Sequence, residues 1–401
     1  MPKNIIFCAD GTWNGPGKDD DDTSPASNVW KLFMQLDGTL DPATLPLANE
    51  QEKTLAGDGG HAAKYIHGVG DSSVLLDRVF GGMFGSGIIE RIVRGYTFIS
   101  RNYEDGDSIY IVGFSRGAYT ARALGGLITD MGLLNNAGNR LDDKAMAYRL
   151  GAAVWRAHRD KRVQARAANT GNNGLVALFK SVVDALPHFI STPLGPNDVI
   201  ATRNHIRAIA VWDTVGALGI PLYADSDDRM DVFRFADTAL SQNVDFGIHA
   251  ISLDEQRADF TPTLWDARSG VTQVLFPGAH ADVGGGYPPN ETGLSNGALV
   301  WMVAKLSDLG VKFHGAPALT SGNADSIGHR PWATGVFTSL KQGPRTVLET
   351  AHGTDQLGFH HSISMRLQAS PTTWLPDNNT TQYAPTVLAS VIAANTQWEK
   401  P

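Results

Sequence analysis

Short apolar segments alternate along the chain with longer amphipathic segments. Four short runs, mainly apolar and β-branched and followed by Gly, Asp or Pro, are typical of buried strands: residues 4–9, 108–112, 205–212 and 271–276. Three longer segments place apolar side chains at helical spacing: residues 28–36, 88–102 and 294–309. This alternation predicts an α/β fold, in which a mostly parallel sheet carries helices on both faces and inserted lid segments between core elements.

The strand predicted over residues 108–112 leads into residues 113–117, Gly-Phe-Ser-Arg-Gly, which match the pattern G-x-S-x-G. Small residues that suit a helix follow from Ala118. A serine on a sharp turn between a strand and a helix, flanked by glycines that let the two backbones pass closely, is a nucleophile elbow. The pattern is short enough to occur by chance among 43 glycines, but the strand before it and the helix after it favour a catalytic Ser115 over a structural turn.

An unassisted serine hydroxyl is a poor nucleophile, so Ser115 needs a base, and the base needs an orienting carboxylate. Catalytic groups of an open α/β sheet collect at the carboxyl ends of the strands. Asp213 ends one predicted strand, His280 follows the next, and the order Ser, Asp, His is that of α/β-hydrolases. We therefore predict Ser115 as nucleophile, His280 as general acid and base, and Asp213 as its orienter. The competing interpretation is that Asp213 caps a turn and His280 is a loop residue.

A second assignment of the acid and the base preserves the same chain order. It keeps Ser115 but takes Asp282 as the acid and His361 as the base. Asp282 is two residues from His280 in a glycine-rich loop, so we expect it near the site under either assignment. Its alternative role is to bind the backbone N–H groups of residues 284–286.

Two backbone N–H groups are expected to stabilise the oxyanion that forms when Ser115 attacks a carbonyl. One belongs to Arg116, the residue after the nucleophile. The other comes from the loop after the first strand, with Gly11 or Thr12 as the donor. Asp10 is then a near-site residue, and the competing interpretation is a tight turn that Asp10 caps.

We expect residues 1–401 to form a single α/β-hydrolase domain, because α/β domains with insertions often reach this length. Residues 140–200 differ in composition: a locally basic stretch is followed by polar residues and by an apolar helix candidate, Leu175 to Leu186. Enzymes of this architecture place a lid in an insertion between core strands. We therefore predict a lid or cap within residues 140–200.

Composition narrows the classes of partner and cofactor. The formal net charge of −8 provides no basic footprint for nucleic acid and no bulk attraction to anionic lipid. Cys8 is the only cysteine, which excludes an internal disulfide, and its place in an apolar strand predicts a buried thiol. His280 with Asp282, and His360 with His361, are candidate metal-ligand pairs. No second cluster with metal-site spacing accompanies them, so we expect neither a metal nor another cofactor.

The N-terminal residues lead directly into a predicted strand, without the apolar core and the cleavage site of a signal peptide. No apolar run approaches the roughly 18 residues that cross a bilayer. We therefore expect cytoplasmic synthesis without a signal peptide. Export by a contact-dependent secretion system would leave no mark of this kind in the sequence.

Six motifs occur together, in the order in which a known family carries them. They are residues 10–14 (D-G-T-W-N), 68–70 (G-V-G), 113–122 (G-F-S-R-G-A-Y-T-A-R), 212–216 (W-D-T-V-G), 277–287 (P-G-A-H-A-D-V-G-G-G-Y) and 361–362 (H-S). Together they resemble the α/β-hydrolase domain of the class-one type VI secretion lipase effectors (Tle) and the wider family of uncharacterised hydrolases that contains them. The resemblance covers most of the chain, and two of its strings are far more specific than a bare G-x-S-x-G.

The resemblance implies a phospholipase that cleaves acyl esters of glycerophospholipids and is delivered into neighbouring bacterial cells. It assigns the family's serine, acid and histidine to Ser115, Asp213 and His280. It also implies peripheral membrane contact and a secretion or immunity partner. Two alternatives stay open: a soluble carboxylesterase or thioesterase with the same triad, and a hydrolase fold kept as a binding module without turnover.

Overall fold

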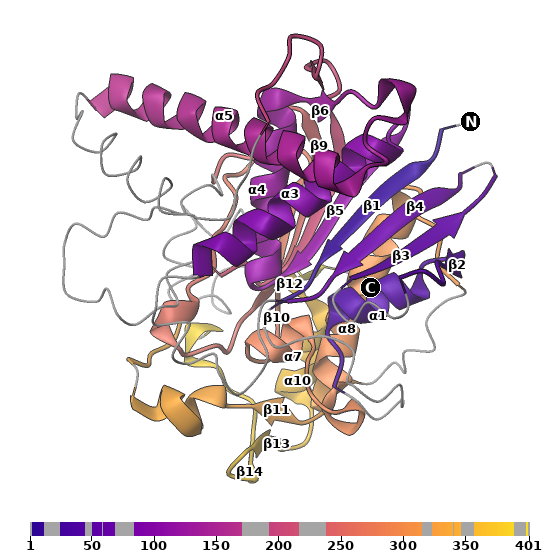
Figure 1. Cartoon of the computed structure of the whole chain (residues 1–401). Helices are drawn as coiled ribbons and strands as arrows, with labels where there is room; N and C mark the ends of the chain where they lie inside the picture. The colour runs from indigo at the N-terminus through magenta and orange to yellow at the C-terminus, as the bar shows by residue number, and fades with distance from the viewer. Residues whose placement is uncertain are drawn as a thin grey trace.

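The computed structural model describes residues 2–11, 25–44, 50–57, 59–68, 84–170, 192–215, 238–314, 323–339, 341–345, 357–388 and 398–399. These residues form a ten-stranded sheet in the order β15-β12-β10-β9-β8-β5-β1-β4-β3-β2, with helices on both faces (Figure 1). Neighbouring strands are parallel except for β4–β3 and β3–β2, which are antiparallel and form one edge. The predicted α/β fold with a mostly parallel sheet is confirmed.

The central strands of the sheet are buried on both faces. In chain order the strands are β1 (Asn4–Ala9), β2 (Thr39–Leu40), β3 (Glu50–Leu55), β4 (His61–Ile66), β5 (Ser108–Phe114), β8 (Ile206–Trp212), β9 (Val244–Ser252), β10 (Val271–Phe276), β12 (Gly358–His360) and β15 (Trp398–Glu399). Almost every residue of β1, β5 and β8 is buried, which explains why these strands are continuous apolar runs in the sequence.

Side chains of successive β1 residues point to opposite faces and enter two separate apolar cores. Ile5 and Phe7 pack in the core under α3, α4 and α5, whereas Ile6 and Cys8 pack in the core under α1 and α8. Figure 1 shows these two helical layers on either side of the sheet. The helices are α1 (Asn28–Gln35), α3 (Phe84–Asn102), α4 (Arg116–Met131), α5 (Lys144–Thr170), α7 (His280–Gly284), α8 (Gly293–Asp308) and α10 (His361–Gln368). Within the described residues, no helix combines the length and the apolar character that crossing a membrane requires.

Two smaller sheets lie outside the main one. One pairs β6 (Leu133–Leu134) with β7 (Val199–Ile200), and the other joins β11 (Gly328–His329), β13 (Thr372–Leu375) and β14 (Asn379–Thr381). In Figure 1 the second of these sheets lies with α7 and α10 beyond the carboxyl ends of the central parallel strands. This is the end of an α/β sheet at which ligands bind.

One core strand, β9, was not predicted. The prediction that Asp213 and His280 follow successive strands is therefore wrong: they follow β8 and β10, and β9 lies between these two strands in the sheet. The apolar pattern of β9 is interrupted by Asp245, Gly247 and His249. Tertiary packing nevertheless buries the second half of the strand, including the polar ring of His249.

Helix α5 forms most of the described part of the predicted lid segment. Apolar side chains of its first half, such as Leu150, pack in the core with α3 and α4. His158 of α5 bonds to Asp130 at 3.0 Å, near the end of α4 that lies farthest from Ser115. The apolar helix candidate Leu175 to Leu186 lies outside the described residues. The lid and the single-domain organisation therefore stay predictions.

Candidate active site

Ser115 occupies a sharp turn between β5 and α4. Its φ of 57° and ψ of −123° lie in a region that a residue with a side chain rarely adopts. A Cβ atom on Gly113 would lie 2.4 Å from the carbonyl oxygen of Gly117, and a Cβ on Gly117 would lie 2.1 Å from that of Ala9. The two glycines of G-x-S-x-G are thus required by the close approach of α4 to β5 and β1, as a nucleophile elbow demands.

A buried pair of side chains stands beside this turn. Asp213 directly follows β8, and its Oδ2 accepts a hydrogen bond from His280 Nδ1 at 2.5 Å. The backbone N–H of Ser115 donates to the carbonyl oxygen of Trp212 at 3.1 Å, which ties the serine to the residue before Asp213. The His280 ring packs against the ring of Phe114, the residue before Ser115, with centroids 4.7 Å apart. The structure thus joins Asp213 to His280 directly and places the backbone of Ser115 beside the residue that precedes Asp213.

The hydrogen-bond geometry fixes the tautomer of His280. A buried carboxylate only accepts hydrogen bonds, so Nδ1 carries the proton that is shared with Asp213, and Nε2 is left with a lone pair. Burial lowers the pKa of His280, and the hydrogen bond and charge of Asp213 oppose this effect only in part. The ring is therefore neutral at neutral pH, as a general base must be.

Arg345 forms a two-pronged ion pair with Asp213. Its Nη1 donates to Asp213 Oδ1 at 2.6 Å and its Nη2 donates to Oδ2 at 2.9 Å. Burial by itself would raise the pKa of Asp213, but the charge of Arg345 and the hydrogen bonds from His280 and Arg345 outweigh burial and hold this pKa below its usual range. Asp213 is therefore an ionised carboxylate, although it is fully buried.

A second ion pair supports His280 from its backbone. Glu255 accepts the backbone N–H of His280 at 3.2 Å and is bonded to Arg257 through both carboxylate oxygens at 2.8 Å. The guanidinium of Arg257 lies 3.5 Å from the ring centroid of Phe260, and that ring packs edge-on against His280 at 5.0 Å. Two carboxylate–guanidinium pairs and two aromatic rings thus enclose the imidazole.

Sequence reasoning gave no role to Glu255, Arg257 or Arg345. Glu255 and Arg257 stand close together between predicted strands, but oppositely charged neighbours are common on solvated loops, so this signal is weak. Arg345 is 132 residues from Asp213 and lies in no predicted element. Nothing in the sequence pairs Arg345 with the acid.

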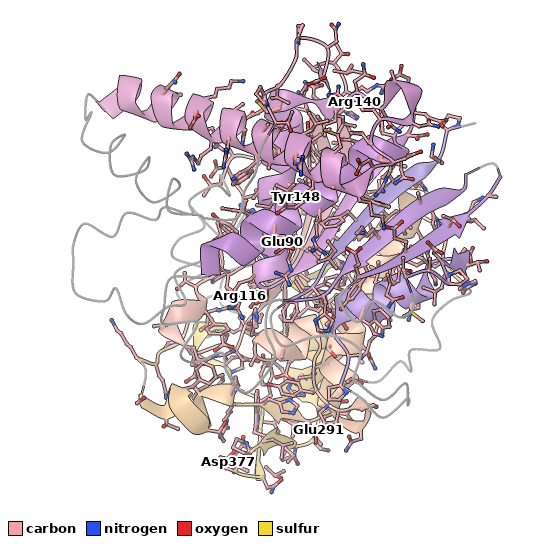
Figure 2. The ribbon with its side chains drawn as sticks, in the orientation of Figure 1. Glu90, Arg116, Arg140, Tyr148, Glu291 and Asp377 are labelled. Atoms are coloured by element: carbon pink, nitrogen blue, oxygen red, sulfur yellow. The ribbon has the colours of Figure 1, made fainter. Side chains whose placement is uncertain are left out.

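The two predicted oxyanion donors have different surroundings. Arg116 is the first residue of α4, and N–H groups in the first turn of a helix have no acceptor within the helix. Figure 2 shows Arg116 at the end of the helical layer that faces α7, with Arg140 at the opposite end. The N–H of Gly11 donates to Asp10 Oδ1 at 2.7 Å, so it must leave this partner to bind an oxyanion. Thr12 lies outside the described residues.

Asp10 is fully enclosed near the elbow. Its Oδ2 accepts hydrogen bonds from Ser27 Oγ and from Tyr65 Oη, each at 2.6 Å. Burial raises the pKa of Asp10 to about 7, although these donors and the Gly11 N–H favour the ionised form. Asp10 therefore links α1 and β4 to the loop after β1.

In the second predicted assignment, Asp282 is bonded to other groups and His361 packs against another ring. Asp282 accepts the backbone N–H of Ala279 at 2.9 Å, and its other oxygen bonds to His329 Nδ1 at 2.6 Å. The His361 ring packs against the ring of its neighbour His360, with centroids 4.1 Å apart. The acid and base that the structure joins directly are thus Asp213 and His280.

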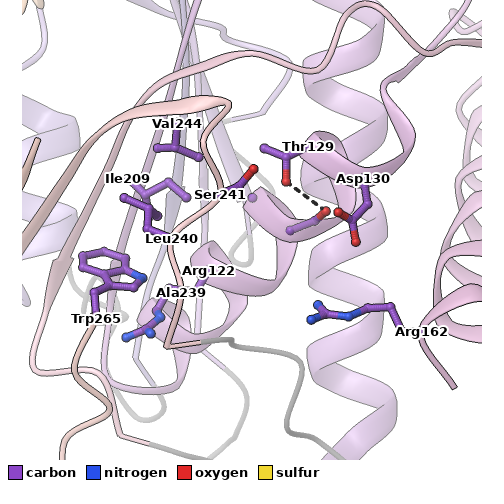
Figure 3. Close-up of a pocket in the computed structure, with 12 residues that line it drawn as sticks. Arg122, Thr129, Asp130, Arg162, Ile209, Ala239, Leu240, Ser241, Val244 and Trp265 are labelled. Atoms are coloured by element: carbon purple, nitrogen blue, oxygen red, sulfur yellow. Dashed lines mark hydrogen bonds between the residues drawn. The ribbon is translucent and has the colours of Figure 1, made fainter. Parts of the chain in front are cut away.

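A cavity of about 220 Å³ lies between α4, β8 and the residues before β9 (Figure 3). Arg122, Asp130, Arg162 and Trp265 are among its lining residues, whereas Ser115, Asp213 and His280 are not. The cavity is therefore separate from the elbow.

A strained serine after a central parallel strand, with a buried aspartate–histidine pair beside it, defines the α/β-hydrolase class of protein. Within that class, the chain belongs to the family described as T6SS, phospholipase effector Tle1-like, catalytic domain. The model of this family matches residues 3–305.

The chain is also similar to individual proteins, over part of its length in each case. The chain is 31% identical over 147 residues to an uncharacterised protein of Saccharomyces cerevisiae, YEL023C, and this match covers 33% of the chain and 18% of the yeast protein. A crystal structure of an uncharacterised protein from Pseudomonas aeruginosa has 16% identity and a TM-score of 0.38, covering 78% of this chain and 46% of its own. The structure of the Tle1 effector bound to the VgrG spike of the type 6 secretion system has 17% identity and a TM-score of 0.34, with coverages of 73% and 53%. The chain thus spans less than two thirds of the length of each of these relatives.

Proposed function

We propose that this chain is a serine ester hydrolase that cleaves acyl esters of phospholipids, with Ser115, His280 and Asp213 as its catalytic triad. The observation that carries the proposal is the 2.5 Å bond between Asp213 and His280, placed beside a serine that is held in a strained turn. Family membership supports the phospholipid substrate and delivery by type VI secretion.

The first half of the proposed reaction forms an acyl-enzyme. Ser115 Oγ attacks the ester carbonyl while His280 Nε2 accepts its proton, and Asp213 stabilises the imidazolium that results. The N–H of Arg116 stabilises the negative charge on the carbonyl oxygen, together with a donor from the loop after β1. The carbon–oxygen ester bond then breaks, and His280 gives its proton to the departing alcohol, which is a lysophospholipid.

The second half releases the fatty acid. Water attacks the acyl-enzyme while His280 again accepts a proton, and the same N–H donors stabilise the second oxyanion. Collapse of this intermediate returns the proton from His280 to Ser115 Oγ and frees the carboxylic acid. The two steps in which His280 accepts a proton need a neutral ring, which agrees with the lowering of its pKa by burial.

The test is acyl release from vesicles of defined phospholipids and from p-nitrophenyl butyrate. Ser115→Ala and His280→Ala are each expected to lose about three orders of magnitude or more in kcat on both substrates. His361→Ala is the matched control, because His361 is the base of the alternative assignment, and it should stay near wild type.

Three results would contradict parts of the proposal. Loss of activity in His361→Ala with retention in His280→Ala would favour the second assignment. Cleavage of the short ester alone would identify a soluble carboxylesterase. No turnover of either substrate by the folded wild-type protein would favour a binding module.

A further inference from the structure

We propose that Arg345 is a positioning residue for the catalytic base, which acts through Asp213 to hold His280 in its productive orientation and to keep it neutral at neutral pH. The inference rests on the proposed roles of Ser115, Asp213 and His280. It adds a fourth side chain to the proposed triad, from a segment far away in the sequence.

Arg345 holds the carboxylate of Asp213 in one orientation. The guanidinium is a planar fork, and its two terminal nitrogens reach one oxygen each of Asp213, at 2.6 and 2.9 Å. Asp213 Oδ1 also accepts the backbone N–H of Ser252 at 2.9 Å, so the carboxylate plane is held at both oxygens. Arg345 is fixed in turn by the carbonyl oxygens of Ser252 and Phe260. The carboxylate therefore presents Oδ2 to His280 in one orientation.

Arg345 also changes the charge that faces His280. A buried carboxylate with no other partner strongly favours the protonated form of a bonded imidazole, which would leave His280 unable to accept a proton from Ser115. Arg345 neutralises Asp213 while leaving its hydrogen bond to His280 intact. With the pair neutralised, burial decides the state of the ring, and burial favours the neutral form.

The remaining charged groups around His280 balance each other. Glu255 contacts the backbone of His280 and would favour the imidazolium, but Arg257 neutralises it through a buried pair. His249 also faces Asp213, and burial lowers its pKa to about 3, so it adds no charge at neutral pH. Removal of Arg345 thus leaves one uncompensated negative charge beside His280.

The test measures the titration of His280 directly, without turnover. The protein is labelled with ¹³C at histidine Cε1, and the His280 signal is assigned by its loss in His280→Gln. In Arg345→Met the pKa of His280 should rise by about one pH unit or more, because an opposing charge at this range changes a pKa by roughly that amount. If Arg345→Met does not fold, Arg345→Gln replaces it, since Gln keeps N–H donors without a charge.

Two controls separate this role from general stability. Arg366→Met removes another buried arginine, which donates to the carbonyl oxygens of Ala324 and Ser326, and it should leave the His280 titration unchanged. Arg345→Lys keeps the charge and should hold the pKa of His280 close to that of the wild type.

The reaction rate of Ser115 is a second measure of the same change in the pKa of His280. The reaction of Ser115 with a fluorophosphonate depends on neutral His280. At a pH below the pKa of His280 in both proteins, an increase of one pH unit in this pKa lowers the neutral fraction of His280 about tenfold. The Arg345→Met protein should then react with the fluorophosphonate about tenfold more slowly than wild type. An unchanged His280 pKa in both uncharged variants would overturn the role of Arg345. A wild-type protein that does not react with the fluorophosphonate would instead count against the proposed function, and the titration would still decide the role of Arg345.

Discussion

Asp10 is a buried carboxyl group whose protonation should affect the stability of the folded chain. Its pKa of about 7 lies above the value of about 4 that an unfolded aspartate has, so the folded state holds the proton more tightly. Its stabilising contribution is present in full below about pH 4 and is lost as the pH rises through about 7. Asp10→Asn should remove this contribution to the pH dependence, because Asn does not titrate.

The measurement is the thermal midpoint of unfolding at a series of pH values from about 4 to 8. Wild type should lose more stability over this range than Asp10→Asn. Asp308→Asn, which changes an exposed carboxyl group at the end of α8, is the control and should follow wild type. Parallel curves for wild type and Asp10→Asn would show that folding does not raise the pKa of Asp10.

At the scale of elements, the approach of α4 to β1 depends on the absence of a side chain at Gly117. A Cβ there would meet the carbonyl oxygens of Ala9 and Asp10 at 2.1 and 2.6 Å, and these are backbone atoms that cannot rotate away. Gly117→Ala should therefore lower the free energy of unfolding by about 1–3 kcal/mol, as overpacked core substitutions do. A Cβ on Gly126 of the same helix would have its nearest neighbour at 3.7 Å. Gly126→Ala should therefore raise the free energy of unfolding by roughly 0.5–1 kcal/mol.

Denaturant unfolding of the two alanine variants measures this difference. Equal stabilities for Gly117→Ala and Gly126→Ala would mean that α4 does not approach β1 as closely as the structure indicates.

At the scale of the whole molecule, Cys8 reports on the integrity of the sheet. It lies in β1, is fully buried, and burial raises the pKa of its thiol above the usual range. A thiol reagent such as dithionitrobenzoate should therefore not react with the native protein and should react with one equivalent after unfolding in guanidinium, since the chain has one cysteine. Reaction of the native protein as fast as the unfolded one would contradict the buried position of β1.

Much of the central sheet could be predicted from local sequence patterns. The runs that became β1, β5, β8 and β10 are apolar because both faces of a parallel sheet are covered, and such runs are visible without a structure. β9 was missed because Asp245, Gly247 and His249 break its apolar pattern, and only packing against β8 and β10 makes it a strand.

The sequence by itself determined the elbow and the candidate acids and bases, because G-x-S-x-G and residues at strand ends are local signals. It left two pairings open, Asp213 with His280 and Asp282 with His361. The tertiary structure decided which side chains meet: Asp213 is bonded to His280, whereas Asp282 is bonded to His329, and this supports the first pairing. It also brought Arg345 to Asp213. The physical reason is that hydrogen bonds and ion pairs depend on distances between side chains, and residues far apart in the chain acquire those distances only when the sheet and its loops are assembled.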